Sequence, residues 1–154
     1  YDYVVNWGNN GHDIKENTRK VYPQLGDNLG WKITSESEYF RGGITFNAIS
    51  SSAIGFKWFF DGAIFSNASH AIMCNSPKQL AIALAFLNTK VVTDILSLIS
   101  PTINYTPSDI KKLPYVFIQD TDIASSVADT NIKLSQKDWD ACEISWDFKR
   151  HPLV

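Results

Sequence analysis

Cysteine is scarce in this sequence: only Cys74 and Cys142 occur among 154 residues, with no CxxC or Cys/His spacing around either. A disulfide framework and a structural zinc site are therefore not expected, and a reduced, cytoplasmic protein is the simpler interpretation. Catalytic signatures are also missing, because His12, His70 and His151 are scattered and no GxSxG, HExxH or Walker-type loop is present. The sequence predicts no catalytic, cofactor-binding or metal-binding residues of its own.

The sequence also lacks a strong net positive charge. The net charge is −2 and the pI about 5.9, so the overall charge does not indicate a nucleic-acid partner. The charge is unevenly spread, however, and residues 32–112 carry seven basic against five acidic side chains. With 44% hydrophobic and 13% aromatic residues the chain has the composition of a globular domain, and its cations gather in the middle of the sequence.

Short strand-like runs separated by turn residues fill the segment after Gly42-Gly43. The runs are rich in β-branched and aromatic residues, and Asp61-Gly62 is a tight-turn dipeptide. We expect strands at residues 44–49, 54–60, 63–65 and 70–74, forming a small and mainly antiparallel sheet. Earlier in the chain, residues 6–11 suit turns with positive φ, and a short helix is plausible over Asp13–Lys20.

The clearest expected element is a long core helix over residues 77–100. Ser76 is placed as its N-cap, Pro77 at its first position and Gln79 three residues after the cap, as in a capping box. Four polar residues in its middle, Asn88, Thr89, Lys90 and Asp94, argue against a membrane span. A short helix from residue 108 or 109 and a mainly helical stretch over 120–143, with Ser135 capping residues 136–143, complete an α+β fold.

Polar and basic side chains cluster around the expected sheet and suggest contacts with phosphates and base edges. The candidate DNA-binding residues are Arg41, Thr45, Asn47, Ser50, Ser51, Ser52, Lys57, Lys111 and Lys112. The arginine and the lysines are candidates for phosphate, and the amide and the serines for base edges. An ordinary sheet edge with a solvated polar face accounts for the same composition, and the aromatic run 56–60 is core more often than a base-stacking platform.

Several segments, in order along the chain, resemble one family. They are Val4-Val-Asn-Trp-Gly-Asn-Asn-Gly-His-Asp-Ile-Lys15, Phe40-Arg-Gly-Gly-Ile-Thr-Phe46 with Ile49-Ser-Ser51, Phe86-Leu-Asn-Thr-Lys90, Pro101-Thr-Ile-Asn-Tyr105 with Ser108-Asp-Ile-Lys-Lys-Leu-Pro114, and residues 138–153. Together they resemble the region C-terminal to the catalytic domain in PglX-type adenine-specific DNA methyltransferases of BREX phage-defence systems. The 86–90 motif, followed by an Asn-containing loop and a Leu-Pro segment, also looks like the target-recognition domains of restriction–modification systems.

The resemblance implies a parent enzyme that uses S-adenosylmethionine to methylate adenine N6 in double-stranded DNA. This chain lacks an Asn-Pro-Pro-Tyr tetrad for the flipped adenine and the Gly-containing loop for S-adenosylmethionine, so the fragment itself is expected to be inactive and to hold no cofactor. It is expected to be an excised piece, with a target-recognition-like domain at 1–118 and a helical connector at 119–154. Its expected partners are duplex DNA, the rest of the parent methyltransferase and other defence-system proteins, but no membrane; the alternative is a protein-interaction or scaffolding module of the same complex.

Overall fold

The computed structural model describes residues 4–51, 53–66, 68–115, 122–151 and 153. The chain divides into two compact units, residues 1–38 with 138–154 and residues 39–137. The predicted boundary between residues 118 and 119 lies outside the described residues.

The first unit contains α1 (Gly8–Val21), which includes the helix expected from Asp13 to Lys20. Its first turn is left-handed, with φ values of 50° at Asn9, 58° at Asn10 and 68° at Gly11. Asparagine and glycine tolerate this region better than other residues, so the positive-φ turn read from the sequence is confirmed. Three short 3-10 turns follow, at Pro23–Leu25, Leu29–Trp31 and Glu36–Glu38, and an ion pair of 2.5 Å joins Lys15 to Glu36 in the last of them.

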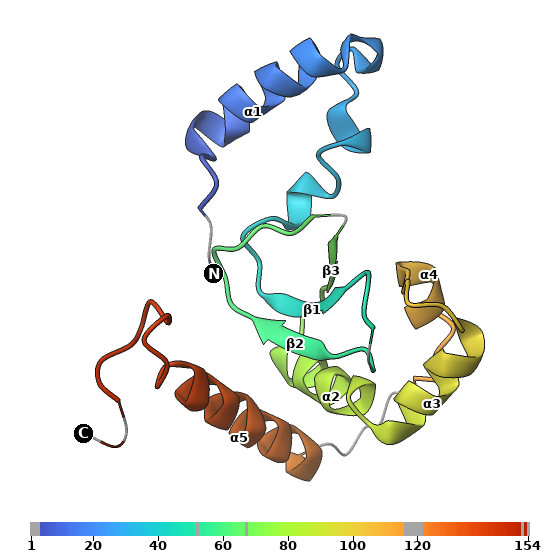
Figure 1. Cartoon of the computed structure of the whole chain (residues 1–154), viewed down its shortest axis with the longest axis vertical. Coiled ribbons are helices and arrows are strands. Elements are labelled where there is room, and N and C mark those ends of the chain that lie inside the picture. Colours follow the sequence, from blue (N-terminus) through green and yellow to red (C-terminus); the bar gives the residue numbers. More distant parts are fainter. Residues whose placement is uncertain (1–3, 52, 67, 116–121, 152, 154) are drawn as a thin grey trace. The chain divides into compact units, whose positions relative to one another are not determined.

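The second unit is built on a sheet of three strands within the described residues, β1 (Gly43–Asn47), β2 (Phe56–Phe59) and β3 (Ser69–Ile72). The order is β2-β1-β3 and both pairings are antiparallel, as expected (Figure 1). The strand expected at 63–65 is wrong. Gly62, in a turn at φ 95°, donates to the Phe40 carbonyl, and Ala63 accepts from the Phe40 amide, so this segment is tied to the approach to β1 and joins no ladder.

The single long helix expected over 77–100 is also wrong, because it is two helices bent by 70° (Figure 1). α2 (Pro77–Leu87) begins at Ser76, whose side chain accepts from the Gln79 amide, while Gln79 Oε1 has no partner, so only half of the expected capping box forms. α3 (Lys90–Ile99) begins at a new N-cap, Thr89. No single helix in the described part of the chain has the length and apolarity to cross a membrane, and only this bent pair, taken together, meets those criteria.

The core of the second unit lies between one face of the sheet and the helix pair. Ile44, Val92 and Leu96 are completely or almost completely buried there, and Phe46 and Leu80 pack in the same cluster. Burying side chains of this size is worth roughly 1.5–3 kcal/mol each, so the cluster fixes which face of the sheet turns inward. The alternation of β1 then sends Thr45 to the opposite face.

Two further helices complete the described elements. α4 (Pro107–Ile110) starts at Thr106 with a full capping box to Asp109, close to the helix start expected at residue 108 or 109. α5 (Asp122–Trp139) confirms the mainly helical character of this region. The expected cap at Ser135 is wrong, because the helix runs through this residue without interruption and ends at Trp139.

Candidate nucleic-acid interface

The outward side of the sheet carries most of the polar strand residues that the sequence singled out. In the register, Thr45 stands opposite Lys57 on β2 and Ala71 on β3, and Asn47 stands opposite Ser69. Directly opposed residues of an antiparallel pair point to the same face. Thr45, Asn47, Lys57, Ser69 and Ala71 therefore share one surface, here called the outer sheet face, on the side away from α2.

Two residues of the outer sheet face are bonded together and two project freely. Thr45 Oγ1 donates to the His70 carbonyl at 3.0 Å and lies 2.7 Å from Ser69 Oγ, which must then be the donor in that contact because a hydroxyl has one proton. Asn47 and Lys57 are exposed, and no described residue hydrogen-bonds or ion-pairs with either side chain. The face thus offers a free amide and a free ammonium beside a fixed pair of hydroxyls.

Arg41 lies just before β1, at the end opposite Asn47. Its guanidinium donates to Asn75 Oδ1 at 3.0 Å, which places it beside the end of β3. The Gly42-Gly43 pair that follows permits a close approach of three chain segments, because a Cβ on Gly43 would lie 2.7 Å from the Ile72 carbonyl oxygen and from Met73 Sδ. With about 3.3 Å per strand residue, Arg41 and Asn47 are roughly 20 Å apart.

The serine loop after β1 is tied to a distant segment of the chain. Ser50 N donates to the Ile103 carbonyl at 2.9 Å, and Tyr105 N donates to the Ala48 carbonyl at 2.7 Å. The Ser50 hydroxyl bonds the Ala53 carbonyl at 3.4 Å, so it is engaged within the loop, and Ser51 is exposed. Ser52 lies outside the described residues.

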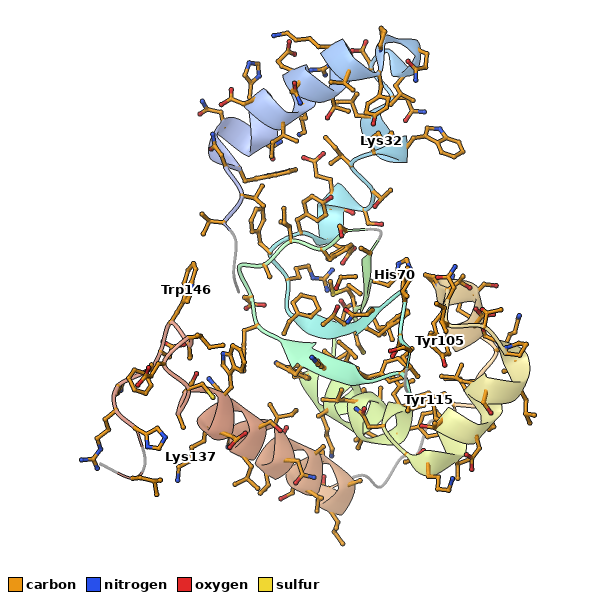
Figure 2. The ribbon with its side chains drawn as sticks, viewed as in Figure 1. Lys32, His70, Tyr105, Tyr115, Lys137 and Trp146 are labelled. Atoms are coloured by element: carbon orange, nitrogen blue, oxygen red, sulfur yellow. The ribbon has the colours of Figure 1, made fainter. Side chains whose placement is uncertain are left out.

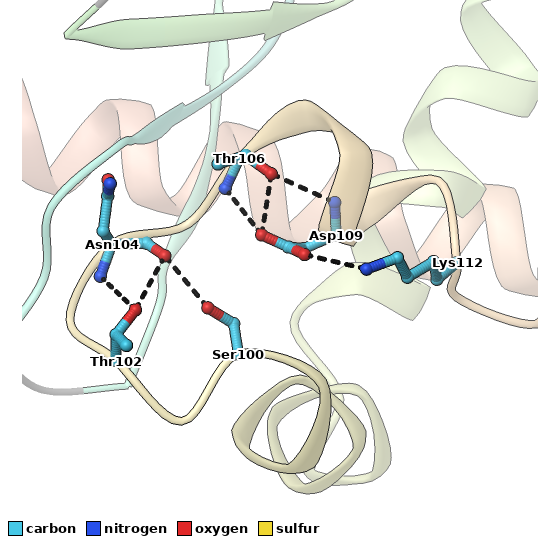
Figure 3. Close-up of polar contacts among 6 residues, drawn as sticks. All are labelled: Ser100, Thr102, Asn104, Thr106, Asp109 and Lys112. Atoms are coloured by element: carbon cyan, nitrogen blue, oxygen red, sulfur yellow. Dashed lines mark hydrogen bonds and ion pairs between the residues drawn. The ribbon is translucent and has the colours of Figure 1, made fainter.

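Lys111 and Lys112 are not on the sheet. Both are exposed and follow α4, where Lys112 Nζ lies 3.3 Å from Asp109 Oδ1. Figure 3 shows this ion pair next to the capping contacts between Thr106 and Asp109. The hydrogen bonds from Thr106, helped by Lys112, hold the pKa of Asp109 below its ordinary value, so this carboxylate stays charged and offsets one of the two lysines.

Sequence reasoning missed two polar residues that the structure adds to this region. Ser69 joins the outer sheet face through the β1–β3 register, which no local pattern reveals. Asn104 is exposed on the loop that holds the serine segment, and its backbone pairs with Ile49 in an isolated antiparallel bridge. The motif at 101–105 pointed to this loop, but not to its place beside residues 48–50.

His70 lies on the inner side of the sheet, because it alternates along β3 with Ala71, which stands opposite Thr45 on the outer face. Figure 2 labels His70 among the side chains of the chain. The His70 ring packs on Phe46 with a centroid distance of 5.3 Å, and partial burial lowers the pKa of His70 because the charged form loses hydration. Among the aromatic residues at 56–60, Phe56 and Phe59 are buried and Trp58 packs against the core, so the core interpretation of this run is confirmed for those three. Phe60 is exposed.

A surface hollow of about 480 Å³ lies beside Arg41. Its charged groups already have intramolecular roles: Arg41 bonds Asn75, and Asp61 Oδ1 accepts from the Gly42 amide at 2.6 Å. The described residues contain no cluster of His, Cys, Asp and Glu suited to a metal ion. They also do not fit S-adenosylmethionine, because Gly42-Gly43 precedes a strand of an antiparallel sheet and opens no helix within the described chain.

Comparison with known proteins shows that this chain is homologous, along its whole length, to a segment of adenine-specific methyltransferases. It is 26% identical over 156 residues to the adenine-specific methyltransferase BrxX of Escherichia coli O9:H4 (strain HS), covering 100% of the chain. It is 29% identical over 153 residues to the adenine-specific methyltransferase PglX of Lacticaseibacillus casei (strain Zhang), covering 99% of the chain. The chain spans about 12% of the length of each relative, and no family model matches it.

Proposed function

We propose that this chain is the DNA target-recognition segment of a BREX-type adenine-specific DNA methyltransferase. The observation that carries the proposal is homology to two adenine-specific methyltransferases along the whole chain, in a segment whose sequence has no tetrad for a flipped adenine. A segment of such an enzyme that performs no chemistry must bind, orient or connect. The free cationic and amide side chains of the outer sheet face support binding to DNA.

In this proposal Arg41 and Lys57 contact phosphates and Asn47 approaches base edges, with Ser50 and Ser51 on the adjoining loop. Lysine and arginine neutralise the DNA backbone, while an amide recognises the edge of adenine. The span of roughly 20 Å from Arg41 to Asn47 corresponds to about six base pairs at 3.4 Å per step. That length matches a short recognition sequence.

For the whole protein we propose N6 methylation of adenine in duplex DNA, with S-adenosylmethionine bound by a part of the enzyme outside this chain. The role of the glycine pair in packing three segments against one another supports a cofactor site outside this chain. The other expected partners are the remainder of the parent methyltransferase and other proteins of the phage-defence system. Such an enzyme acts in the cytoplasm, where the host DNA is.

The test is duplex binding by the full-length protein carrying Arg41→Gln and Lys57→Gln together. Loss of two phosphate contacts should weaken binding and reduce the slope of log K against log salt by about 2. The matched control is Lys133→Gln with Lys137→Gln, which removes two exposed cations from α5 and should leave the slope unchanged. An unaltered affinity and slope in the Arg41/Lys57 variant would reject this surface.

A protein-interaction role within the same complex is the second candidate, and an exposed apolar stripe on α5 favours it. Ile123, Val127 and Leu134 are 83%, 55% and 58% exposed and recur at helical spacing on one side of α5. Replacing Ile123 and Leu134 with glutamine should release a partner protein from the purified complex if this role holds. Intact assembly combined with lost DNA binding in the Arg41/Lys57 variant would decide for target recognition.

A further inference from the structure

The loop at 101–105 holds an exposed carboxamide, that of Asn104, whose own backbone is hydrogen-bonded to neighbouring residues. The Asn104 backbone carbonyl accepts from Ser100 Oγ at 2.9 Å and from Thr102 Oγ1 at 3.3 Å, and the Asn104 amide N donates to Thr102 Oγ1 at 3.3 Å. Figure 3 shows the carboxamide of Asn104 outside this network of contacts. No described residue hydrogen-bonds to it, so its donor and acceptor are both available.

Ile49 is the direct neighbour of Asn104 across the bridge. The flanking hydrogen bonds, Ser50 N to the Ile103 carbonyl and Tyr105 N to the Ala48 carbonyl, leave Ile49 and Asn104 as a non-hydrogen-bonded antiparallel pair. In such a pair the Cα atoms are about 4.5 Å apart and the side chains project together. Ile49 is 66% exposed, so an apolar group and a free carboxamide stand side by side on the surface.

The pair is held more firmly than an ordinary surface loop. Tyr105, next to Asn104, is buried in the core cluster and anchors one side, and the two backbone hydrogen bonds to residues 48 and 50 anchor the other. A side chain on a rigid backbone loses less conformational freedom when it binds, which makes it suitable for specific recognition. Stability alone does not require an exposed isoleucine beside an unbonded amide.

We infer that the Ile49–Asn104 pair reads one A·T base pair in the major groove of the target DNA. A carboxamide can donate to adenine N7 and accept from adenine N6 at once, and an apolar side chain contacts the C5-methyl group of the paired thymine. The inference rests on the proposed DNA-recognition function and adds to it the kind of base pair read. Ile49 lies two residues after Asn47, so the pair continues the same chain segment beyond the outer sheet face.

The experiment is selection by the full-length protein from a library of DNA duplexes with a randomised central segment. The wild type should enrich a motif, and Asn104→Ala should enrich that motif with one A·T position relaxed. At that position discrimination should fall roughly 5- to 150-fold, the range for one bidentate contact, while affinity for unrelated duplex stays the same. Asn131→Ala, which removes an exposed amide from α5, is the matched control and should keep the wild-type motif.

A second variant isolates the apolar half of the pair. Replacing thymine by deoxyuridine at the relaxed position removes only the methyl group of the base. This replacement should weaken DNA binding by the wild type but should not change DNA binding by the Ile49→Ala variant. Asn104→Asp keeps the size of the side chain but loses the NH₂ donor, so this variant should also lose the preference for adenine at this position. Thermal unfolding of each variant checks that the loop remains folded. We expect it to do so, because no described residue hydrogen-bonds to the Asn104 carboxamide.

The two levels of the proposal fail in different ways. If Asn104→Ala and Asn104→Asp both enrich the wild-type motif at every position, the pair does not read bases, while DNA recognition by this chain stands. If the wild type enriches no motif at all, the target-recognition function is wrong and the pair has nothing to read. Loss of binding to every duplex in Asn104→Ala would make Asn104 a general contact and would also overturn the inference.

Discussion

The amide of Asn88 joins the break between α2 and α3 to the edge of the sheet, and its removal tests this connection. Asn88 Oδ1 accepts from Phe56 N at 3.2 Å, and Asn88 Nδ2 donates to the carbonyls of Phe56 and Leu84, both at 3.0 Å. Within the described residues β2 is an edge strand, so no further strand there pairs with these Phe56 groups. The side chain takes the place of that missing strand.

The magnitude follows from the groups left without a partner. Asn88→Ala leaves one donor and one acceptor of Phe56 unpaired, and an unpaired group costs about 1–3 kcal/mol depending on its access to water. Phe56 is buried but Asn88 itself is exposed, so water can reach the site and the lower end applies. We expect the free energy of unfolding to fall by about 2 kcal/mol, or Tm by roughly 4–8 °C for a chain of this length.

Urea and thermal unfolding followed by circular dichroism measure the loss. Asn88→Asp should be at least as destabilising, because its carboxylate faces the Phe56 and Leu84 carbonyls at a helix C-terminus. Asn131→Ala, in the exposed face of α5, is the control and should not lower stability. A free energy of unfolding for Asn88→Ala within about 0.5 kcal/mol of the wild type would refute the bridging role.

Two predictions concern protonation. Thr106→Ala should cost about 1 kcal/mol at neutral pH through loss of the α4 cap; because the folded-state pKa of Asp109 is lowered, its contribution is present above its ordinary pKa and is lost in acid, so the difference from wild type should shrink below about pH 4. The pKa of His70 is also lowered in the folded chain, so stability should fall as pH drops below about 6.5, and His70→Gln should flatten that part of the curve. Urea midpoints measured across the pH range report both effects.

Opposite results would be equally informative. An undiminished Thr106→Ala deficit in acid would separate the cap from the Asp109 carboxylate. Parallel pH curves for His70→Gln and the wild type would mean that the His70 ring is as well hydrated in the folded chain as in the unfolded chain.

The helix break at Asn88 illustrates how far local patterns reached. Apolar residues recur at helical spacing through residues 80–98, and that periodicity alone favours one uninterrupted helix. The chain bends because Asn88 bonds a strand 32 residues away while Thr89 caps a new helix. Thr89 is of a residue type that commonly caps helices. Whether it caps a helix here depends on the hydrogen-bond partner of Asn88, which the local sequence does not reveal.

For the candidate interface, strand alternation alone puts Thr45 and Asn47 on one face, but the placement of Lys57 on that face requires the β1–β2 register. A shift of one residue would have moved Lys57 to the core side. The register follows from burying Ile44 and Phe46 against α2 and α3, which is a property of the packed unit. Lys111 and Lys112, grouped with the sheet on charge alone, lie on a separate element.

The sequence by itself determined the features whose causes lie within a few residues: the left-handed turn at 9–11, the cap at Ser76 and the strand character of the segment after Gly42-Gly43. It also carried the resemblance to PglX-type methyltransferases. Tertiary structure alone decided the bend at Asn88, the addition of Ser69 to the outer sheet face and the pairing of Ile49 with Asn104. Caps and turns are hydrogen-bonded by residues that are close along the chain, so they can be predicted from the local residue types. Faces and bridges depend on partners brought together by burial of a shared core, and no local pattern contains that information.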